Sequence, residues 1–378
     1  MMPSAHDRLV SRISRILWHM GFFCRSNVPV DLVRWVPEEA TSRTKISIAD
    51  IDVLGLKYDI DLERRLTIVE GKTGDLKPAD RILWVRGLMD YVKADDAYLV
   101  ALKEEESFAE VSRLLGIQLL NEAKMTELEK SLGIDEGYVG PFDPFLFAKR
   151  VEFYAELKKS RARKPLYFVT FRAWEENLPH LSLKSVIGQG KNLSEALGSK
   201  LAYNEAEIWL ANELLVVFSV ALLNYSAMFR GISYADTSRF EAEIKRTISH
   251  GRLNPYEMNQ LTSLFYDLMK TYVKTKFGRD LDINKEDLFD IEPAYAVDLA
   301  DTVFRILNSP LESKEVVRAM DVLTSLGEGQ SEEGVVKKLL PNVDVPKVTK
   351  MAENNARLFC KATGLVPELY SKIGLRQL

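Results

Sequence analysis

The sequence predicts an α/β domain with a mixed central sheet, followed by a mainly α-helical domain. Three observations support this fold class. Short runs rich in Ile, Val and Leu alternate with segments of helical periodicity over the first 140 residues. Glycine and proline are concentrated at residues 137–144, which marks a domain boundary. From about residue 201 onward, nearly every segment has the periodicity of an amphipathic helix.

The first domain is predicted to begin with an amphipathic helix over residues 6–20. Its apolar residues recur every three or four positions, at Leu9, Ile13, Ile16, Leu17 and Met20. The further elements that we predict are strands at 46–57 and 66–72, a helix from 78 to about 92, a strand at 97–102, a helix at 107–115, a strand at 117–120 and a helix at 125–132. This order predicts three layers, with helices on the faces of a mixed sheet.

We divide the chain into residues 1–140, a basic connecting segment at 141–200 and a helical domain at 201–378. The connecting segment is expected to carry a helix near 145–163 and one strand at 166–172. The helices predicted for the last part are at 201–230, 239–249, 255–277, 293–307 and 313–326.

Composition sets limits on the class of protein. A chain of 378 residues with 46% hydrophobic residues has enough apolar side chains for two or three folded domains. The net charge of −4 predicts neither a nucleic-acid nor a membrane partner for the chain as a whole. Cys24 and Cys360 are the only cysteines, as expected in a reducing compartment, and the first residues lack a signal peptide. We therefore expect a cytoplasmic protein.

One apolar run, residues 208–229, approaches the length of a membrane span. It contains Asn212, Glu213 and Asn224, which favour the core helix of a soluble domain over a membrane anchor. We expect no membrane association.

Charged residues interrupt two strands that are otherwise apolar. Asp50 and Asp52 lie in the first, Ile-Ala-Asp-Ile-Asp-Val-Leu-Gly, and Glu70 and Lys72 lie in the second, Thr-Ile-Val-Glu-Gly-Lys. If the turn between them is centred near Asp61, residues whose numbers sum to about 122 are opposite each other, and Asp52 then faces Glu70. Opposite residues project from the same side of a sheet, with Cβ atoms about 5 Å apart. A slip of one residue would separate them.

Two adjacent carboxylates repel each other, and burial of an unpaired one is costly. A divalent cation removes both penalties, and oxygen ligands suit Mg²⁺ or Mn²⁺. Lys72 follows Glu70 at the spacing that keeps both on one face, so we expect it to hold a water or an anionic oxygen beside the metal. The alternative is that these residues form ordinary ion pairs on a strand, worth a few tenths of a kcal/mol.

The pattern Asp52-Val-Leu-Gly, a hairpin, then Val69-Glu70-Gly71-Lys72 resembles the PD-(D/E)xK nuclease superfamily, which has the restriction-endonuclease-like fold. The opening helix and the helix and strand after Lys72 are similar to that family as well, over residues 5–135. The resemblance implies that Asp52 and Glu70 bind the metal, with a carbonyl near Gly71, and that Lys72 is the catalytic lysine.

Two features depart from the family pattern. Ile51 stands where the motif has proline, and the acidic residue that the opening helix often supplies is represented here only by Asp7. Asp7 is therefore a candidate for a supporting role only. Asp50 is either a supporting acid or a salt-bridge partner.

The resemblance implies an Mg²⁺-dependent endonuclease that hydrolyses phosphodiester bonds, with DNA as the expected substrate and host defence or restriction as the setting. The alternative is a catalytically inactive relative that serves as a DNA-binding or protein-interaction module. The helical domain is expected to contact DNA, a partner protein or a second copy of the chain.

The densest basic run has two interpretations that remain open. It is a patch that binds the nucleic-acid backbone, or it is a solvated helix end. The run consists of Lys158, Lys159, Arg161, Arg163 and Lys164. The helix predicted at 78–92 also carries polar residues, Arg81 among them, which the resemblance places beside the site.

Overall fold

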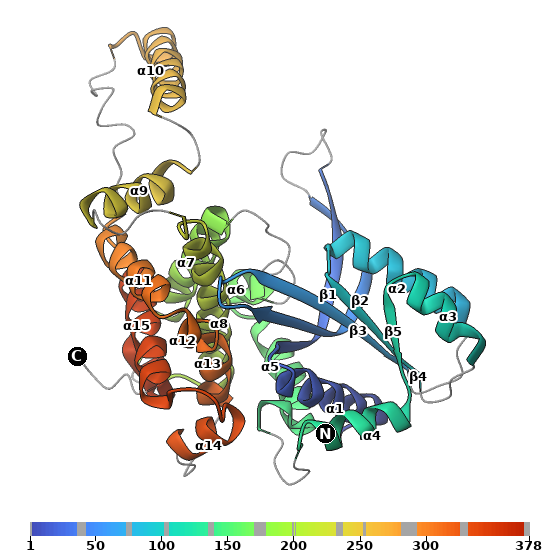
Figure 1. The fold of residues 1–378 in the computed structure, drawn as a ribbon. Helices are drawn as coiled ribbons and strands as arrows, with labels where there is room; N and C mark the ends of the chain where they lie inside the picture. Colours follow the sequence, from blue (N-terminus) through green and yellow to red (C-terminus); the bar gives the residue numbers. More distant parts are fainter. Residues whose placement is uncertain are drawn as a thin grey trace.

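The computed structural model describes residues 2–35, 43–72, 78–101, 106–134, 140–169, 179–198, 200, 202–231, 237–251, 255–280, 293–325 and 332–373. Its first part consists of a sheet with helices, and the later part is helical (Figure 1). The elements of the first part are α1 (Ala5–His19), β1 (Phe23–Trp35), β2 (Arg43–Tyr58), β3 (Arg64–Lys72), α2 (Pro78–Val92), β4 (Asp96–Ala101), α3 (Glu106–Leu114), β5 (Ile117–Leu120) and α4 (Glu122–Ser131). The predicted helices and strands occur in the predicted order, but β1, between α1 and β2, was not among the predicted elements.

The five strands form a mixed open sheet in the order β1-β2-β3-β4-β5. The first three strands are antiparallel, and β3, β4 and β5 are parallel. The β2–β3 pairing runs from Tyr58↔Arg64 to Val53↔Val69, so paired residue numbers sum to 122 as the sequence predicts. Asp59 closes the turn, because its Oδ1 accepts from the backbone N–H groups of Asp61 and Glu63.

One face of the sheet is covered by α1 and α4. The buried apolar residues of α1 are Leu9, Val10, Ile13, Ile16 and Leu17, and they form a cluster with Val53 and Val69 of the central strands and Met125 of α4. The approach of α1 is close at Gly71, where an added Cβ would lie 3.2 Å from Leu9 Cδ2. Glycine at this position therefore lets α1 rest directly on β3.

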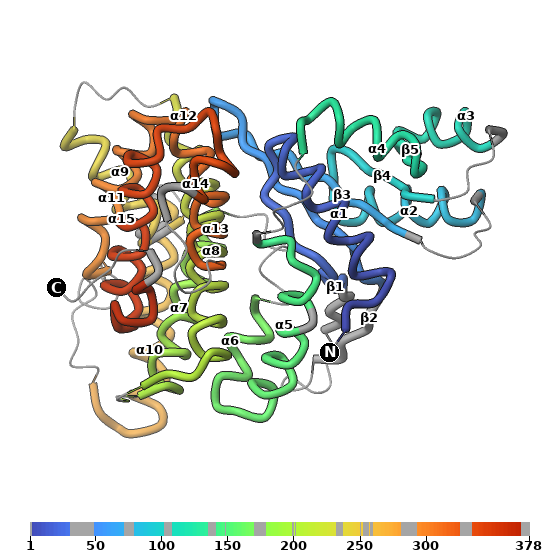
Figure 2. Tube along the Cα trace, turned by 90° about the horizontal axis from the view of Figure 1, so that it is seen from below, coloured from blue at the N-terminus to red at the C-terminus, as the bar shows by residue number. Residues whose placement is uncertain are grey.

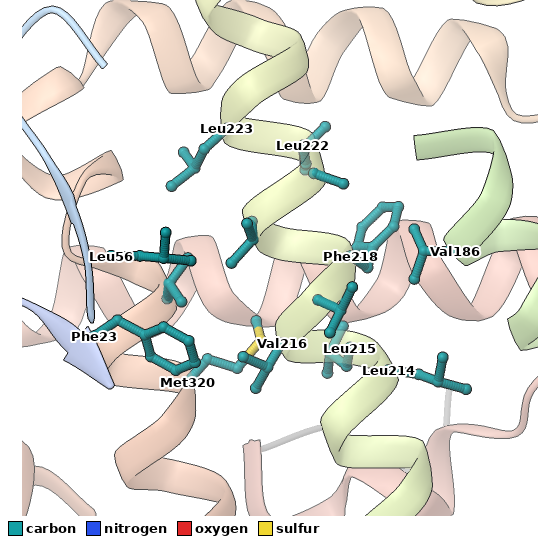
Figure 3. Packing of buried hydrophobic residues seen from close by; sticks show 14 of the residues in the cluster. Phe23, Leu56, Val186, Leu214, Leu215, Val216, Phe218, Leu222, Leu223 and Met320 are labelled. Carbon is teal, nitrogen blue, oxygen red and sulfur yellow. The ribbon is translucent and has the colours of Figure 1, made fainter. Parts of the chain in front are cut away.

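The other face is covered by α2 near β3 and β4, and by helices of the later part near β1 and β2. Ile82 and Val85 of α2 belong to the same buried cluster as Leu99 of β4 and as Phe23 and Leu56. Phe23 and Leu56 lie beside α8 and Met320 (Figure 3). The sheet and the helical part thus share one continuous apolar core and lie side by side (Figure 2).

Beyond residue 140 the described chain is helical throughout. Its elements are η1 (Gly140–Phe142), α5 (Pro144–Leu157), α6 (Arg163–Tyr167), α7 (Pro179–Leu197), α8 (Glu205–Ala227), α9 (Thr237–His250), α10 (Pro255–Phe277), α11 (Ala296–Asn308), α12 (Pro310–Ser313), α13 (Val316–Ser325), α14 (Glu332–Leu339), α15 (Val345–Thr363) and η3 (Pro367–Ile373). The predicted helices from about residue 201 onward are confirmed within a few residues at their ends.

The strand predicted at 166–172 is wrong for the described residues. Leu166 and Tyr167 belong to α6, and residues 168 and 169 are also helical, whereas 170–172 lie outside the described residues. The buried positions are consecutive pairs, Pro165 with Leu166 and Phe168 with Val169, instead of alternating. Tertiary burial at helical spacing has overridden the β propensity of this apolar segment.

Helix α7 was not predicted, although its apolar residues have helical spacing. Leu183, Val186, Ile187, Leu193 and Leu197 are buried on one side of it. Gly188 and Gly190 obscure the pattern, because glycine in a helix interior normally argues against a helix. In the structure Gly190 is where α7 meets α15, since a Cβ there would lie 2.4 Å from Thr363 Cγ2.

The long apolar helix α8 is the centre of the helical part. It alone among the described helices is long and apolar enough to cross a membrane, and 78% of its most apolar window is buried inside the protein. Its side chains contact the sheet on one side and neighbouring helices on the other (Figure 3). Of the asparagines that interrupt its hydropathy, Asn212 is buried, and the half-buried Asn224 accepts a hydrogen bond of 3.0 Å from the Tyr58 hydroxyl.

A buried group of charges joins the sheet to the helical part. Arg25 of β1 contacts Glu213 of α8 at 3.1 Å and Asp321 of α13 at 2.8 Å, and Arg150 of α5 lies 4.0 Å from Glu213. We call these four residues the Arg25 cluster. Burial works against the charged guanidinium of Arg25, but the two carboxylates outweigh it and raise its pKa. Burial raises the pKa of Asp321, and the charges of Arg25 and Arg150 oppose that shift.

The Asp321→Asn substitution should destabilise the protein by about 3 kcal/mol, because it leaves the buried Arg25 with a single carboxylate. The matched control is Asp301→Asn, which removes an exposed carboxylate 2.8 Å from Arg305 and should cost less than about 1 kcal/mol. Urea unfolding of the two variants measures both values. Equal costs would show that the Arg25 cluster contributes no more than a surface pair.

Two glycines of α7 provide a second test of packing. Gly190→Ala should destabilise by about 1–3 kcal/mol, because the new methyl group overlaps Thr363 and Phe359. Gly188→Ala should stabilise by up to about 1 kcal/mol, since nothing lies within 4 Å of its Cβ position and alanine favours the helix. Thermal unfolding distinguishes the two; destabilisation by both would contradict the assigned packing of α7 against α15.

Candidate functional site

The two predicted carboxylates lie where the β2–β3 hairpin opens. Within the described residues the backbone pairing of β2 with β3 ends at Val53↔Val69, while β3 continues beside β4 to Lys72↔Ala101. Asp52 and Glu70 are the next residues on the two strands. The backbone N–H of Gly71 donates to Asp52 Oδ2 at 2.7 Å, so a side chain ties the strands together beyond the last backbone pair.

Both carboxylates are inside the protein. Asp52 is 7% exposed and Glu70 is 3% exposed, which excludes the interpretation of these residues as ordinary surface ion pairs. Carboxylates at this depth need partners, because burial of an isolated charge costs several kcal/mol. The partners that the protein supplies come from the first turns of α1 and α2.

His6, in the first turn of α1, lies near Asp52, with 3.4 Å between Nε2 and Oδ1. Its side chain is 36% exposed, so it closes the site on the solvent side. No sequence pattern signals this contact, because His6 and Asp52 are far apart in the chain and a single histidine at a helix start has no characteristic pattern.

Arg81, in the first turn of α2, forms an ion pair with Glu70. Its guanidinium also stacks on the half-buried Trp84, 3.9 Å from the ring centroid. Burial lowers the pKa of Arg81, and the negative charge of Asp52 opposes this shift, so Arg81 is close to both carboxylates. A cation at this point reduces the repulsion between Asp52 and Glu70.

The remaining predicted residues have different positions. The backbone of Lys72 pairs with Ala101, and its side chain lies outside the described residues. Gly71 donates its N–H to Asp52 and faces α1. Asp50 is exposed on β2. Asp7 caps α1, because its Oδ2 accepts from the backbone N–H and the hydroxyl of Ser4. Capping accounts for Asp7 without any role in the site.

Asp52 and Glu70 suit a hard divalent cation that takes only a few of its ligands from the protein. Among the described residues, no group of three or more His, Cys, Asp or Glu side chains is arranged to hold a metal. Two adjacent carboxylates remain, and Mg²⁺ characteristically takes one or two carboxylates and fills its other positions with water and substrate phosphate oxygens. The residues present therefore fit Mg²⁺ or Mn²⁺ but not a structural zinc site.

The basic run of residues 158–164 covers the exposed turn between α5 and α6 and the first two residues of α6, and we call it the basic turn. Its five basic side chains, Lys158, Lys159, Arg161, Arg163 and Lys164, are all exposed. Leu157, Ala162 and Leu166 are buried and anchor the turn to the core, and the Ser160 hydroxyl donates to the Leu157 carbonyl at 2.8 Å. The turn holds its positive charges in solvent on a fixed backbone.

Comparison with models of protein families, with curated proteins and with solved structures found no significant match to this chain. Its function must therefore be inferred from the residues and their geometry.

Proposed function

We propose that the protein is a metal-dependent nuclease that hydrolyses phosphodiester bonds, most naturally those of DNA. The observation that carries this proposal is the burial of Asp52 and Glu70 on neighbouring strands at the point where the hairpin opens. The mixed sheet between α1 and α2 supports a restriction-endonuclease-like fold for residues 1–140.

Asp52 and Glu70 are proposed to hold Mg²⁺ or Mn²⁺, with the Gly71 carbonyl as a further oxygen ligand. A bound cation of this kind polarises phosphate and acidifies water. Glu70 would hold the cation in place of its partner Arg81, and Asp52 would keep its hydrogen bond from Gly71. Lys72 positions the attacking water and offsets the charge that develops on the phosphate.

The basic turn is proposed to bind the phosphate backbone, since such contacts need only positioned Lys and Arg side chains. Its exposed charges are suited to this, while the chain as a whole is slightly acidic. A role in host defence is a proposal that follows from the family resemblance alone. A cytoplasmic location is a proposal that follows from the two cysteines and the first residues of the sequence.

A second candidate function rests on the contacts within the site. Each carboxylate already has protein partners, Gly71 and His6 for Asp52 and Arg81 for Glu70. In a nuclease-like protein without activity, these contacts would be permanent and structural, and the chain would serve as a DNA-binding or protein-interaction module.

Cleavage of plasmid DNA with Mg²⁺ or Mn²⁺ tests the first proposal. Glu70→Gln and Lys72→Ala should each lower the rate by about 10²-fold or more, because each removes charge from the reacting centre. Asp90→Asn, which alters an exposed carboxylate of α2 paired with Arg86, should cleave like the wild type. A wild type that folds and binds DNA or RNA but cuts neither would favour the inactive module.

Arg81→Gln separates a metal site from a permanent ion pair. The variant leaves Glu70 buried without its cation, so in EDTA it should be destabilised by about 3 kcal/mol. If Asp52 and Glu70 bind a metal, millimolar Mg²⁺ or Mn²⁺ should restore much of that loss, because binding to the folded state stabilises it.

The readout is the melting temperature of wild type and variant with and without metal. Arg305→Gln is the matched control, since both Arg305 and its partner Asp301 are exposed, and it should show neither the loss nor the recovery. Failure of the metal to stabilise Arg81→Gln would contradict a metal site.

A further inference from the structure

Helix α10 presents an exposed apolar surface. It stands beyond the end of the helical bundle, away from the sheet (Figure 1). We call the exposed surface the α10 stripe. It consists of Leu261, Leu264, Phe265, Leu268 and Tyr272, which are between 49% and 59% exposed. Large apolar side chains gathered on one side of a helix mark an interaction surface more strongly than the same residues scattered singly.

The spacing of the stripe is that of a two-helix seam. Leu261, Phe265, Leu268 and Tyr272 follow one another at intervals of four, three and four residues. This is the alternation of a and d positions in a heptad, which keeps apolar residues on the side facing a partner helix. Leu264 flanks the seam. A neighbouring side of α10 holds Thr262, Tyr266 and Met269, which are less exposed.

We propose that the α10 stripe pairs with the same stripe of a second copy of this chain, with the two helices antiparallel. If the axis of symmetry passes between Phe265 and Leu268, the seam closes on itself in four layers. Leu261 then packs against Tyr272 of the other copy, and Phe265 against Leu268. Each aromatic side chain meets a leucine, whereas a parallel pair would place tyrosine on tyrosine and phenylalanine on phenylalanine.

The charges of α10 favour the same direction. Its first turn carries Glu257, and its last turn carries Lys274 and Lys276. An antiparallel pair brings the acidic end of each helix to the basic end of the other. A parallel pair would bring the lysines of both copies together, which is unfavourable. Charge and side-chain size therefore select one arrangement.

The size of the stripe sets the strength of the pairing. The lower end of the range for specific interfaces is about 1,200 Å² of buried surface in total. A contact of four layers between two helices lies near this lower end. We therefore expect a dimer that forms and dissociates with concentration, with a dissociation constant on the order of micromolar.

Sedimentation velocity of the full chain between about 1 and 100 μM tests the proposal. The wild type should change from monomer to dimer over this range. Leu268→Glu, which puts a charge in the seam without disturbing the monomer core, should stay monomeric with an unchanged circular dichroism spectrum. The matched control is Leu114→Glu, on the 75% exposed Leu114 of α3, which should dimerise like the wild type.

Direction is tested by disulfide trapping. When the Leu261→Cys and Tyr272→Cys variants are mixed and oxidised, an antiparallel pair should give mainly the mixed disulfide. Predominant 261–261 disulfides would overturn the antiparallel arrangement. A wild type that stays monomeric at 100 μM would overturn the dimer proposal. This holds even if the monomer binds phospholipid vesicles through the same leucines. These outcomes do not depend on whether the protein cleaves DNA.

Discussion

The structure depends on the burial of Arg25 between two parts of the chain that the sequence presents as separate domains. Among the described residues of the sheet part, the Arg25 guanidinium donates to the Cys24 carbonyl and stacks on Phe23, whereas its carboxylate partners come from α8 and α13. Once α8 and α13 are placed by these contacts, Phe23 and Leu56 are covered and the apolar core becomes continuous. Because an ion pair of this kind is costly to break but contributes little net stability compared with apolar contacts, its main effect is to fix one arrangement of the two parts.

At the candidate site, too, buried charges are held by partners from other parts of the fold. Asp52 and Glu70 are buried to a similar degree as Asp321. Asp52 contacts His6 of α1, and Glu70 contacts Arg81 of α2, so the partners come from helices on different faces of the sheet. The difference lies in the partners. Arg25 is enclosed, whereas His6 and Arg81 are partly exposed at the first turns of their helices. Partners on the solvent side can be exchanged for a ligand without opening the core, which is why only this cluster supports a proposal of chemistry.

Local sequence patterns predicted most of the fold. The register of the β2–β3 hairpin followed from the position of its turn, and β5 was predicted with its observed bounds. The failures occurred where tertiary contacts decide. Residues 166–169 have strand propensity but are helical, because they are buried against α7 and α8, and α7 itself was hidden by two glycines, one of which serves its contact with α15. At the site, the register of the hairpin predicted that Asp52 faces Glu70, and the family resemblance placed the helix that carries Arg81 beside them. No pattern connects His6 to them, since that contact depends on how α1 packs.

Helix α1 belongs to both parts of the protein. Its N-terminal turn brings His6 to the candidate site, and near its C-terminal end Trp18 is fully buried, with its indole N–H donating to the Leu339 carbonyl at 3.1 Å. Arg318 of α13 donates to the Trp18 carbonyl at 2.7 Å and stacks on its ring. Residues 1–140 therefore cannot be combined with a different helical domain without further change. Trp18 of the sheet part would lose the contacts with Leu339 and Arg318 that its burial requires. In evolution, a substitution on one side of this contact therefore requires a compensating substitution on the other side.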